Sequence, residues 1–398
     1  MARSLPREVW IVGAKRTAFG AFGGSLKDLT ATDLAVEAAK GALLQANADP
    51  ATIEQVIFGN VQQTSADSIY LARHVGLRAG APIAAAALTV NRLCGSGFQA
   101  IINGTEQILL GESEVLLVGG TESMSQAPHV VRGARWGLPF GKEQKLGDTL
   151  WDALTDSYTG MPMAITAENL AEQYKISRQE CDDYALRSQK AWAAANEAGR
   201  FKDEIVALQI TRADGSTDTH TIDEGIRFDV SLDGIKGVKL IAENGKLTAA
   251  SASQICDGAS GVMVVNERGL KSLGVKPLAR IHHMTMMGGD PVIMLDAPLH
   301  ATKRALEKAG MSINDIDLFE VNEAFAAVPV AWLKTTGADP ERLNVNGGAI
   351  ALGHPLGGSG TKLMTTLVNA LKQNNKRYGL QTMCEGGGMA NVTIVERL

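Results

Sequence analysis

Cysteine is scarce in this chain, and no two cysteines lie close together in the sequence. Only 4 of the 398 residues are cysteine, and none belongs to a Cys-x-x-Cys pair. This spacing fits neither a zinc site nor a disulfide framework, so we expect no metal and a reducing compartment such as the cytoplasm. Each thiol is then expected to serve either packing or chemistry.

Long apolar runs and basic blocks are also missing. The longest apolar candidate, Ala81 to Val90, ends at Asn91 and is well short of the roughly 20 residues that span a bilayer. The 38 basic and 43 acidic residues leave a net charge of −5 without a basic cluster. We therefore expect no membrane span and no nucleic-acid partner. Glu8 stands where a signal peptide needs its apolar core, so secretion is not expected.

Glycine is abundant, with 43 residues, and the chain alternates strand-like and helix-like patterns that predict an α/β fold. The same order of elements occurs twice. In the first half, Val9 to Ala14 is a predicted strand, Thr30 to Leu44 a helix and Gln55 to Asn60 a strand. Leu88 to Gly120 then contains a strand, a helix and a strand. In the second half this order returns over Leu278 to Met287, Pro298 to Ala309, Asp317 to Asn322 and Leu343 onward. We infer two halves of like fold with a shared inner surface.

The predicted domain boundaries follow from this repeat. The N-terminal half covers residues 1–270, with a core of 1–120 and 246–270, and the C-terminal half covers 271–398. Residues 121–245 do not follow the repeat, and they include a charged helical stretch from Thr166 to Ala198. We interpret them as an inserted domain that covers a substrate or coenzyme, and a purely structural insertion is the alternative.

The first of three glycine-rich turns carries a cysteine. Asn91-Arg-Leu-Cys-Gly-Ser-Gly joins a strand to an amphipathic helix, which puts Cys94 at or next to a helix N-terminus. Unpaired N–H groups and the helix dipole favour a thiolate there. We predict that Cys94 is a nucleophile, and an ordinary buried cysteine is the alternative.

The second turn surrounds a histidine and occupies the same place in the second half. Around His354 the glycines are Gly347, Gly348, Gly353, Gly357, Gly358 and Gly360. Symmetry would bring this turn opposite the Cys94 turn. His354 is then predicted to accept a proton or to stabilise negative charge.

The third turn, Cys384-Glu-Gly-Gly-Gly, lies between the last two predicted strands. Consecutive glycines can direct backbone N–H groups at a ligand oxygen, as an oxyanion hole requires, although a tight hairpin would also use them. A second thiol at this place could act as an acid or base.

These turns, with Gly119-Gly-Thr-Glu-Ser-Met-Ser and Asn322-Glu-Ala-Phe-Ala, resemble the thiolase family over essentially the whole chain. Tyr70-Leu-Ala-Arg-His and Pro162-Met-Ala-Ile-Thr look most like the mitochondrial-type 3-ketoacyl-CoA thiolase branch. The resemblance implies a duplicated five-layer α-β-α-β-α fold, with two five-stranded sheets and an inserted loop domain that receives coenzyme A. It also implies a homotetramer or homodimer, and the mitochondrial matrix as the compartment if the source is eukaryotic.

By this resemblance the reaction is thiolytic cleavage of a 3-ketoacyl-CoA by coenzyme A through an acyl-cysteine, or the reverse condensation. Coenzyme A is then a cosubstrate, and no tightly bound cofactor is expected. The implied roles are nucleophile for Cys94, base and oxyanion donor for His354, and acid/base for Cys384. Asn322 would position a water in one oxyanion hole, and the N–H groups of Cys94 and Gly386 would form the other. Arg227 and Ser253 are the candidates for binding coenzyme A.

Three positions depart from the family pattern. Pro162 stands where short-chain biosynthetic members carry histidine, Leu295 stands where glycine is usual, and Glu385 replaces an apolar residue. Pro162 weakens the alternative of an acetyltransferase specialised for acetoacetyl-CoA, and Leu295 predicts a reshaped acyl pocket. A decarboxylating ketosynthase, the more distant alternative, would need a second active-site histidine where Asn322 and Cys384 stand.

Overall fold

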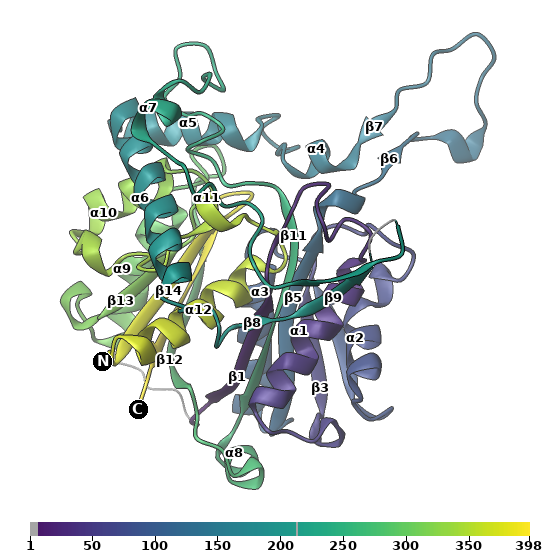
Figure 1. The fold of residues 1–398 in the computed structure, drawn as a ribbon, viewed down its shortest axis with the longest axis vertical. Coiled ribbons are helices and arrows are strands. Elements are labelled where there is room, and N and C mark those ends of the chain that lie inside the picture. Colours follow the sequence, from purple (N-terminus) through teal and green to yellow (C-terminus); the bar gives the residue numbers. More distant parts are fainter. Residues whose placement is uncertain (1–6, 212–213) are drawn as a thin grey trace.

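The computed structural model describes residues 7–211 and 214–398, so the first six residues of the predicted N-terminal half lie outside the description. Figure 1 shows two sheets with a pair of helices between them and further helices on both outer faces. Of the helices in the described ranges, none is long and apolar enough to cross a membrane.

The N-terminal half forms a five-stranded sheet in the order β4-β3-β5-β11-β1. Its strands and helices are β1 (Trp10–Thr17), β2 (Gly20–Ala21), α1 (Ala31–Gln45), β3 (Gln55–Gly59), α2 (Leu71–Ala79), β4 (Ala86–Val90), α3 (Ser96–Leu110), β5 (Val115–Ser123), β11 (Cys256–Val265) and α8 (Glu267–Leu273). Thr30 starts α1 with a capping box to Asp33, as the predicted helix start requires. α1 and α2 cover the outer face of this sheet through an apolar cluster that includes Leu34, Val75 and Phe58.

The C-terminal half repeats this plan. Its elements are β12 (Ala279–Gly288), α9 (Ala297–Ala309), β13 (Leu318–Val321), α10 (Ala327–Thr336), α11 (Ala349–Leu352), α12 (Ser359–Gln373), β14 (Tyr378–Glu385) and β15 (Met389–Glu396). The sheet order is β13-β14-β15-β12, and β12 also pairs with β1 through Ala279 and Arg280. The two sheets are therefore joined in one hydrogen-bonded path.

The expected strand at Leu343 is reduced to a single bridge with Phe319, so the second sheet has four strands where the resemblance implied five. The cause is Asn344, whose backbone has a φ of 46°. Its side-chain Oδ1 accepts from Val321 N at 2.9 Å, and its Nδ2 donates to Val321 O at 2.8 Å. A side chain thus makes the bonds that a fifth strand would have made.

Helices α3 and α12 lie between the sheets, in equivalent places of the two halves (Figure 1). Their apolar faces share one cluster with both sheets, through residues such as Ile101, Met364 and Val262. The helices approach closely at their N-terminal ends, because a Cβ on Gly97 would lie 2.8 Å from Thr361 N. This contact brings the turns that precede the two helices together.

The inserted segment emerges where β5 ends at Ser123 and returns where β11 begins at Cys256. Its elements are β6 (His129–Val130), β7 (Gly147–Asp148), α4 (Thr149–Ala153), α5 (Met163–Gln173), α6 (Arg178–Glu197), β8 (Ile205–Val206), β9 (Leu208–Thr211), β10 (Thr217–His220) and α7 (Leu232–Lys236). The prediction of a single helical stretch from Thr166 to Ala198 is wrong about continuity. The structure has two helices there, because Lys175 has a φ of 50° and Ser177 starts α6 with its own capping box to Glu180.

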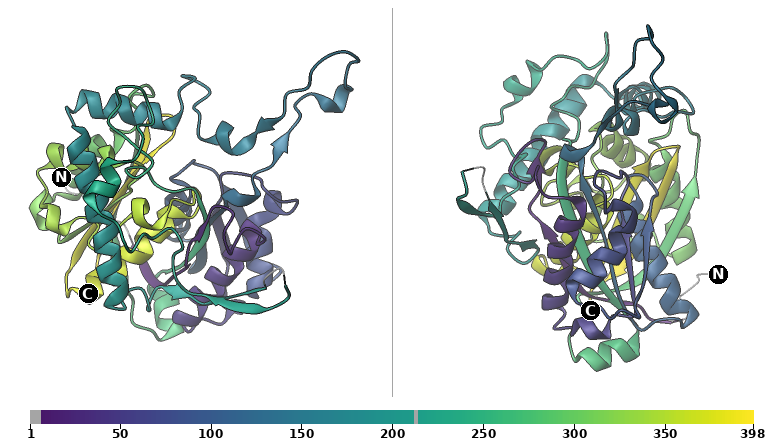
Figure 2. Two further views of the ribbon diagram at one scale, coloured as in Figure 1. Left: turned by 45° about the horizontal axis from the view of Figure 1, so that its top comes forward. Right: turned by 90° about the vertical axis from the view of Figure 1, so that its right-hand side faces the viewer.

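A long arm extends from this segment between β6 and β7, away from the body of the molecule (Figure 2). Its apolar side chains are largely exposed: Trp136 is 88% exposed, and Leu138 and Phe140 are also open to solvent. The helices α5, α6 and α7 instead pack over the C-terminal half. They share an apolar cluster with α9 and α10 that includes Leu170, Ile235 and Trp332.

Candidate active site

Cys94 lies in the turn between β4 and α3, directly before Gly95, the N-cap of α3. The turn is held locally, since Ser96 Oγ accepts from Arg92 N at 2.9 Å and donates to Leu93 O at 2.6 Å. Leu93 has a φ of 51°, a region that a leucine rarely adopts, so the turn is strained. The predicted position of the thiol at a helix N-terminus is confirmed.

His354 lies in the turn that connects α11 to α12. Its Nδ1 is 2.5 Å from Ser359 Oγ, and the Ser359 hydroxyl donates to Pro355 O at 2.9 Å. Because the Ser359 hydroxyl proton is already donated to Pro355 O, Ser359 Oγ accepts the hydrogen bond from Nδ1–H of His354. The lone pair of the neutral ring is therefore on Nε2. Asn322 Nδ2 lies 3.4 Å from this Nε2. Burial lowers the pKa of His354 to about 4, so the ring is neutral at pH 7.

Cys384 lies at the end of β14, and the hairpin that follows it joins β14 to β15. Gly387 and Gly388 have φ angles of 75° and 78°, and only glycine takes such values without strain. Burial, and then the proximity of Cys94, raises the pKa of Cys384. A thiol whose pKa is raised in this way holds its proton at neutral pH and can donate it to a developing carbanion.

One cavity of about 350 Å³ receives all three turns. Cys94, His354, Cys384 and Gly386 line it, whereas Asn322 reaches it through its contact with His354. Residues that are 290 positions apart in sequence thus meet at one place. The cause is the doubled fold, which sets α3 and α12 side by side with their preceding turns at the same end.

The Cys94 thiol is protonated at rest, so the thiolate expected at this helix N-terminus is not the resting form. Burial raises its pKa to about 12, the charges of Glu385 and Glu122 add to this, and the backbone N–H groups of Cys94 and Gly386 act in the opposite direction. These same N–H groups are directed at the sulfur. They are the pair expected to form an oxyanion hole.

Two buried carboxylates support the site, and sequence reasoning did not single them out. Glu122 accepts from Val61 N, Gln62 N and Gly357 N at 2.8 to 3.0 Å, and so links the N-terminal half to the His354 turn. Its burial raises the pKa of Glu122 to about 7. The signal that could have found it is its place inside the Gly119-Gly-Thr-Glu motif.

Glu323 plays the equivalent part beside Asn322. Its carboxylate accepts from Tyr184 Oη at 3.0 Å, Ser188 Oγ at 2.6 Å and Asn344 Nδ2 at 2.8 Å. Two of these donors come from α6 of the inserted segment. Glu323 therefore fixes the inserted segment against the turn that follows β13.

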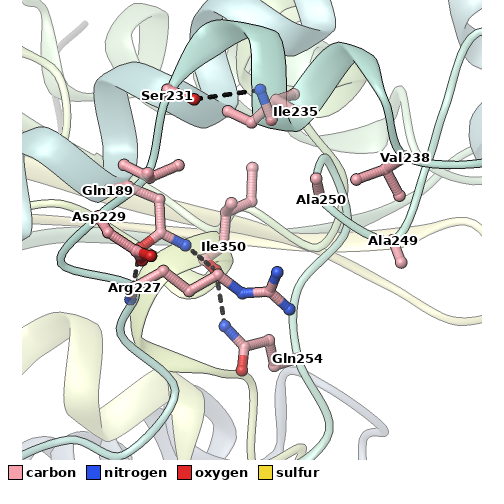
Figure 3. Close-up of a pocket in the computed structure, with 12 residues that line it drawn as sticks. Gln189, Arg227, Asp229, Ser231, Ile235, Val238, Ala249, Ala250, Gln254 and Ile350 are labelled. Atoms are coloured by element: carbon pink, nitrogen blue, oxygen red, sulfur yellow. Dashed lines mark hydrogen bonds between the residues drawn. The ribbon is translucent and has the colours of Figure 1, made fainter.

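The two residues expected to bind coenzyme A lie in adjoining cavities. Ser253 lines the cavity with the cysteines, and its N donates to Ala324 O at 2.9 Å. Arg227 lines a second cavity of about 210 Å³. Figure 3 shows Gln189 and Gln254 meeting there at Ile350 O, to which both side chains donate at 3.2 Å. Gln254 lines both cavities, so the two are adjacent.

The rest of the main cavity is largely apolar. Trp151, Met163 and Phe325 contribute large side chains to its wall, together with Pro162 and Leu295. Pro162 and Leu295, two positions singled out from sequence as departures, thus face the space next to the cysteines, and so does the third departure, Glu385. Within residues 7–211 and 214–398, no group of three or more His, Cys, Asp or Glu could hold a metal ion.

Comparisons with known proteins identify the family of this chain. Residues 9–268 match the family model "Thiolase, N-terminal domain", and residues 275–397 match "Thiolase, C-terminal domain". The chain is 49% identical over 394 residues to the mitochondrial 3-ketoacyl-CoA thiolase of Homo sapiens, covering 99% of each. It is 42% identical to the beta-ketothiolase BktB of Cupriavidus necator, covering 99% of this chain and 100% of that protein.

The structure agrees equally well with solved ones. The human mitochondrial 3-ketoacyl-CoA thiolase in complex with CoA superposes with a TM-score of 0.96 at 48% identity, over 100% of each chain. An acetyl-CoA acetyltransferase of Bacillus anthracis gives a TM-score of 0.95 at 38% identity, over 98% of this chain and 99% of that one. The predicted family and fold class are confirmed, and the chain belongs to the thiolase family.

Proposed function

We propose that this chain is an acetyl-CoA C-acyltransferase that cleaves 3-ketoacyl-CoA with coenzyme A, and that catalyses the reverse condensation. The observation that carries the proposal is the single cavity shared by two thiols and one neutral imidazole, Cys94, Cys384 and His354. The relatives named 3-ketoacyl-CoA thiolase support the substrate class.

The first half-reaction forms an acyl-enzyme. His354 Nε2 takes the Cys94 proton, and the sulfur attacks the 3-keto carbon. The bond between C2 and C3 then breaks, its electron pair passes to acetyl-CoA as an enolate, and Cys384 donates a proton to C2. Cysteine suits the first step because the acyl-thioester it forms can be opened by another thiol at little energetic cost.

The second half-reaction restores the enzyme. The Cys384 thiolate takes the proton of a coenzyme A thiol, whose sulfur attacks the acyl group on Cys94. The Cys94 sulfur leaves and recovers its proton from the His354 imidazolium. The products are acetyl-CoA and an acyl-CoA two carbons shorter than the substrate.

Two oxyanion sites fit this sequence of steps. His354 Nε2, once protonated, and a water held by Asn322 would stabilise one developing oxyanion. The N–H groups of Cys94 and Gly386 would stabilise the other. Loss of one such donor typically slows an enzyme by about 100- to 1,000-fold, so each site would contribute substantially to the rate.

The two adjoining cavities match the two ends of coenzyme A. Arg227 offers a cation to the nucleotide end, and Ser253, on the way to the cysteines, offers a polar contact to the pantetheine arm. The predicted insertion, residues 121–245, supplies Arg227 and would serve as the platform for the coenzyme. The predicted boundary of the two halves at residue 270 stays a prediction.

An enzyme specialised for acetoacetyl-CoA is the second candidate, and the 38% identical acetyl-CoA acetyltransferase structure favours it. Pro162 and the apolar wall argue for a longer acyl group. Comparing kcat/KM for acetoacetyl-CoA and for a medium-chain 3-ketoacyl-CoA separates the two. A strong preference for acetoacetyl-CoA would reject the longer-chain proposal.

Assembly into a homotetramer or homodimer is part of the proposal. The exposed apolar side chains of the arm and the open edge at β4, where Leu88 is 50% exposed, offer surfaces that a second copy would cover. Light scattering of the purified chain measures the assembly. For a eukaryotic source we place the enzyme in the mitochondrial matrix, as the names of the mammalian relatives suggest.

Replacing Cys94 by serine tests the proposed chemistry. We expect Cys94→Ser to abolish thiolysis and to lose acetylation of the enzyme by acetyl-CoA, while coenzyme A binding, measured by calorimetry, stays close to that of the unchanged protein. The matched control is Cys181→Ser, which changes a buried thiol of α6 outside the cavity. Undiminished turnover in Cys94→Ser would remove the nucleophile assignment.

A further inference from the structure

A partly buried ion pair ties the turn that carries Cys94 to the hairpin that carries Cys384. Arg92 Nε donates to Glu385 Oε2 at 2.6 Å, across 293 positions of sequence. The Glu385 side chain is 0% exposed and that of Arg92 is 20% exposed. The two residues of such a pair depend strongly on each other, because removing one partner leaves the charge of the other buried and unpaired.

Further contacts fix the orientation of both side chains. Asn391 Nδ2, from β15, donates to Glu385 Oε1 at 2.5 Å. Arg92 Nη1 donates to Gln99 Oε1 of α3 at 3.1 Å and contacts Met286 Sδ of β12 at 3.4 Å. The pair therefore has defined neighbours on three separate elements.

The carboxylate lies directly against the backbone that presents the nucleophile. A Cβ on Gly95 would collide with Glu385 Oε1, so this residue must be glycine for the carboxylate to approach. On the other side of the turn, a Cβ on Gly386 would lie 2.6 Å from Leu93 Cδ1. The strained Leu93 is thus held between the Cys384 hairpin and the start of α3.

We propose that Glu385 is a positioning residue: its carboxylate, held by Arg92 and Asn391, locks the Cys94 turn against the Cys384 hairpin and places a negative charge beside the nucleophile before substrate binds. The proposal rests on the proposed function for the role of Cys94 as nucleophile. It adds a specific way in which the resting enzyme suppresses a reactive thiolate.

The charges around the thiol support this effect. The titratable groups that face Cys94 are Glu385, Glu122, Cys384 and His354, and the group that faces Glu385 in turn is Arg92. The other neighbours of the ion pair, from α3, β12 and β15, are uncharged. Burial raises the pKa of Glu385 to about 7, and Arg92 opposes the rise. Above that pH its negative charge faces the sulfur and disfavours the thiolate.

Glu385→Gln tests the proposal, because it removes the charge and nearly preserves the shape. The measurement is the rate of Cys94 alkylation by iodoacetamide, followed by peptide mass spectrometry between about pH 7 and pH 10. We expect Glu385→Gln to react about tenfold faster at pH 8.5, since one unit of pKa changes the thiolate fraction tenfold. A rate within about twofold of the unchanged protein would overturn the proposal.

Glu396→Gln is the matched control. Glu396 is a buried glutamate at the opposite end of the β14–β15 ladder, where it pairs with Arg280 and Arg377. Its replacement should lower thermal stability and leave the alkylation rate of Cys94 unchanged. An equal increase in both variants would show that general loosening is responsible, and would also overturn the proposal.

Asn391→Leu provides a second variant in case Glu385→Gln does not fold. It removes one hydrogen bond to the carboxylate, so the pKa of Glu385 rises and more of this residue is neutral at pH 8.5, where alkylation should rise roughly two- to threefold. No rise would count against the proposal. Alkylation needs no substrate, so a failure of this inference can be told apart from a failure of the thiolase assignment, which is read by thiolysis.

Discussion

Ser359 holds the imidazole of His354 from the side opposite to Asn322, with 2.5 Å between Ser359 Oγ and His354 Nδ1. The serine is the first residue of α12, so the helix that builds the layer between the sheets also orients the ring. Its hydroxyl accepts from the ring and donates to Pro355 O, which leaves Nε2 as the basic nitrogen. The tautomer needed for proton transfer from Cys94 is thus set by one neighbouring side chain.

We predict that Ser359→Ala lowers kcat about tenfold with little change in KM. The reason is the loss of a hydrogen bond worth about 1.5 kcal/mol that orients the base. Thr365→Val is the control, since it removes a buried hydroxyl of the same helix that donates only to Thr361 O. Steady-state kinetics of both variants check the prediction, and equal losses of kcat would contradict it.

Much of the site could be predicted because it follows from the repeat. A strand, a small-residue turn and an amphipathic helix occur at equivalent places around Cys94 and His354, and a duplicated fold necessarily brings equivalent turns together. The position of the Cys384 hairpin followed from the strands on either side of it. These inferences needed only local patterns and the symmetry that relates them.

The parts that sequence reasoning missed depend on single long-range contacts. The Arg92–Glu385 pair joins residues 293 positions apart, and neither residue has a pattern that names its partner. The missing fifth strand of the second sheet is decided by the side chain of Asn344, which a strand pattern does not reveal. The break near Lys175 was accessible, because Ser177 and Glu180 have the spacing of a capping box.

Cys384→Ser should separate the two kinds of chemistry in the site. Transfer of an acetyl group from acetyl-CoA to Cys94 reverses the second half-reaction, in which Cys384 exchanges a proton only with the coenzyme A sulfur. Because a thiolate can leave without that proton, acetylation should persist within about tenfold of the unchanged rate. Cleavage of the bond between C2 and C3 needs a proton at C2, and thiolysis should fall by about 1,000-fold or more. Mass spectrometry of the acetyl-enzyme and a thiolysis assay check the two halves. Equal loss of both would contradict the assigned role of Cys384.

The pH dependence of folding should contain a contribution from His354. Its pKa is about 4 in the folded chain, below the ordinary 6.5, so the unfolded chain binds the extra proton between these values. The stability it contributes is complete above about pH 6.5 and is lost as the pH falls through 4. The full difference corresponds to about 3 kcal/mol.

Urea unfolding at about pH 7.5 and pH 4.5 measures this contribution. His354→Asn should lose less stability on acidification than the unchanged protein, by about 2 to 3 kcal/mol. His300→Asn, a change on the exposed side of α9, serves as the control and should follow the unchanged protein. An identical loss in His354→Asn and the unchanged protein would show that the ring is not held neutral by burial.

Leu295 should limit the length of the acyl group. It is 3% exposed, lines the cavity next to the cysteines, and follows Met294, whose φ of 57° directs the turn into that space. Leu295→Ala removes three carbons from the wall, and one methylene of pocket space is worth about 1 to 3 kcal/mol. We therefore expect kcat/KM for a medium-chain 3-ketoacyl-CoA to rise about tenfold relative to acetoacetyl-CoA.

The control for Leu295→Ala is Leu299→Ala, which removes the same atoms from a buried leucine of α9 that does not line the cavity. Both variants should lose about 2 to 5 kcal/mol of stability, because each creates a cavity in the core. Only Leu295→Ala should change the ratio of the two kcat/KM values. An equal change in both variants would mean that chain length is set by general softening of this region, because the local volume at Leu295 would then have no special effect.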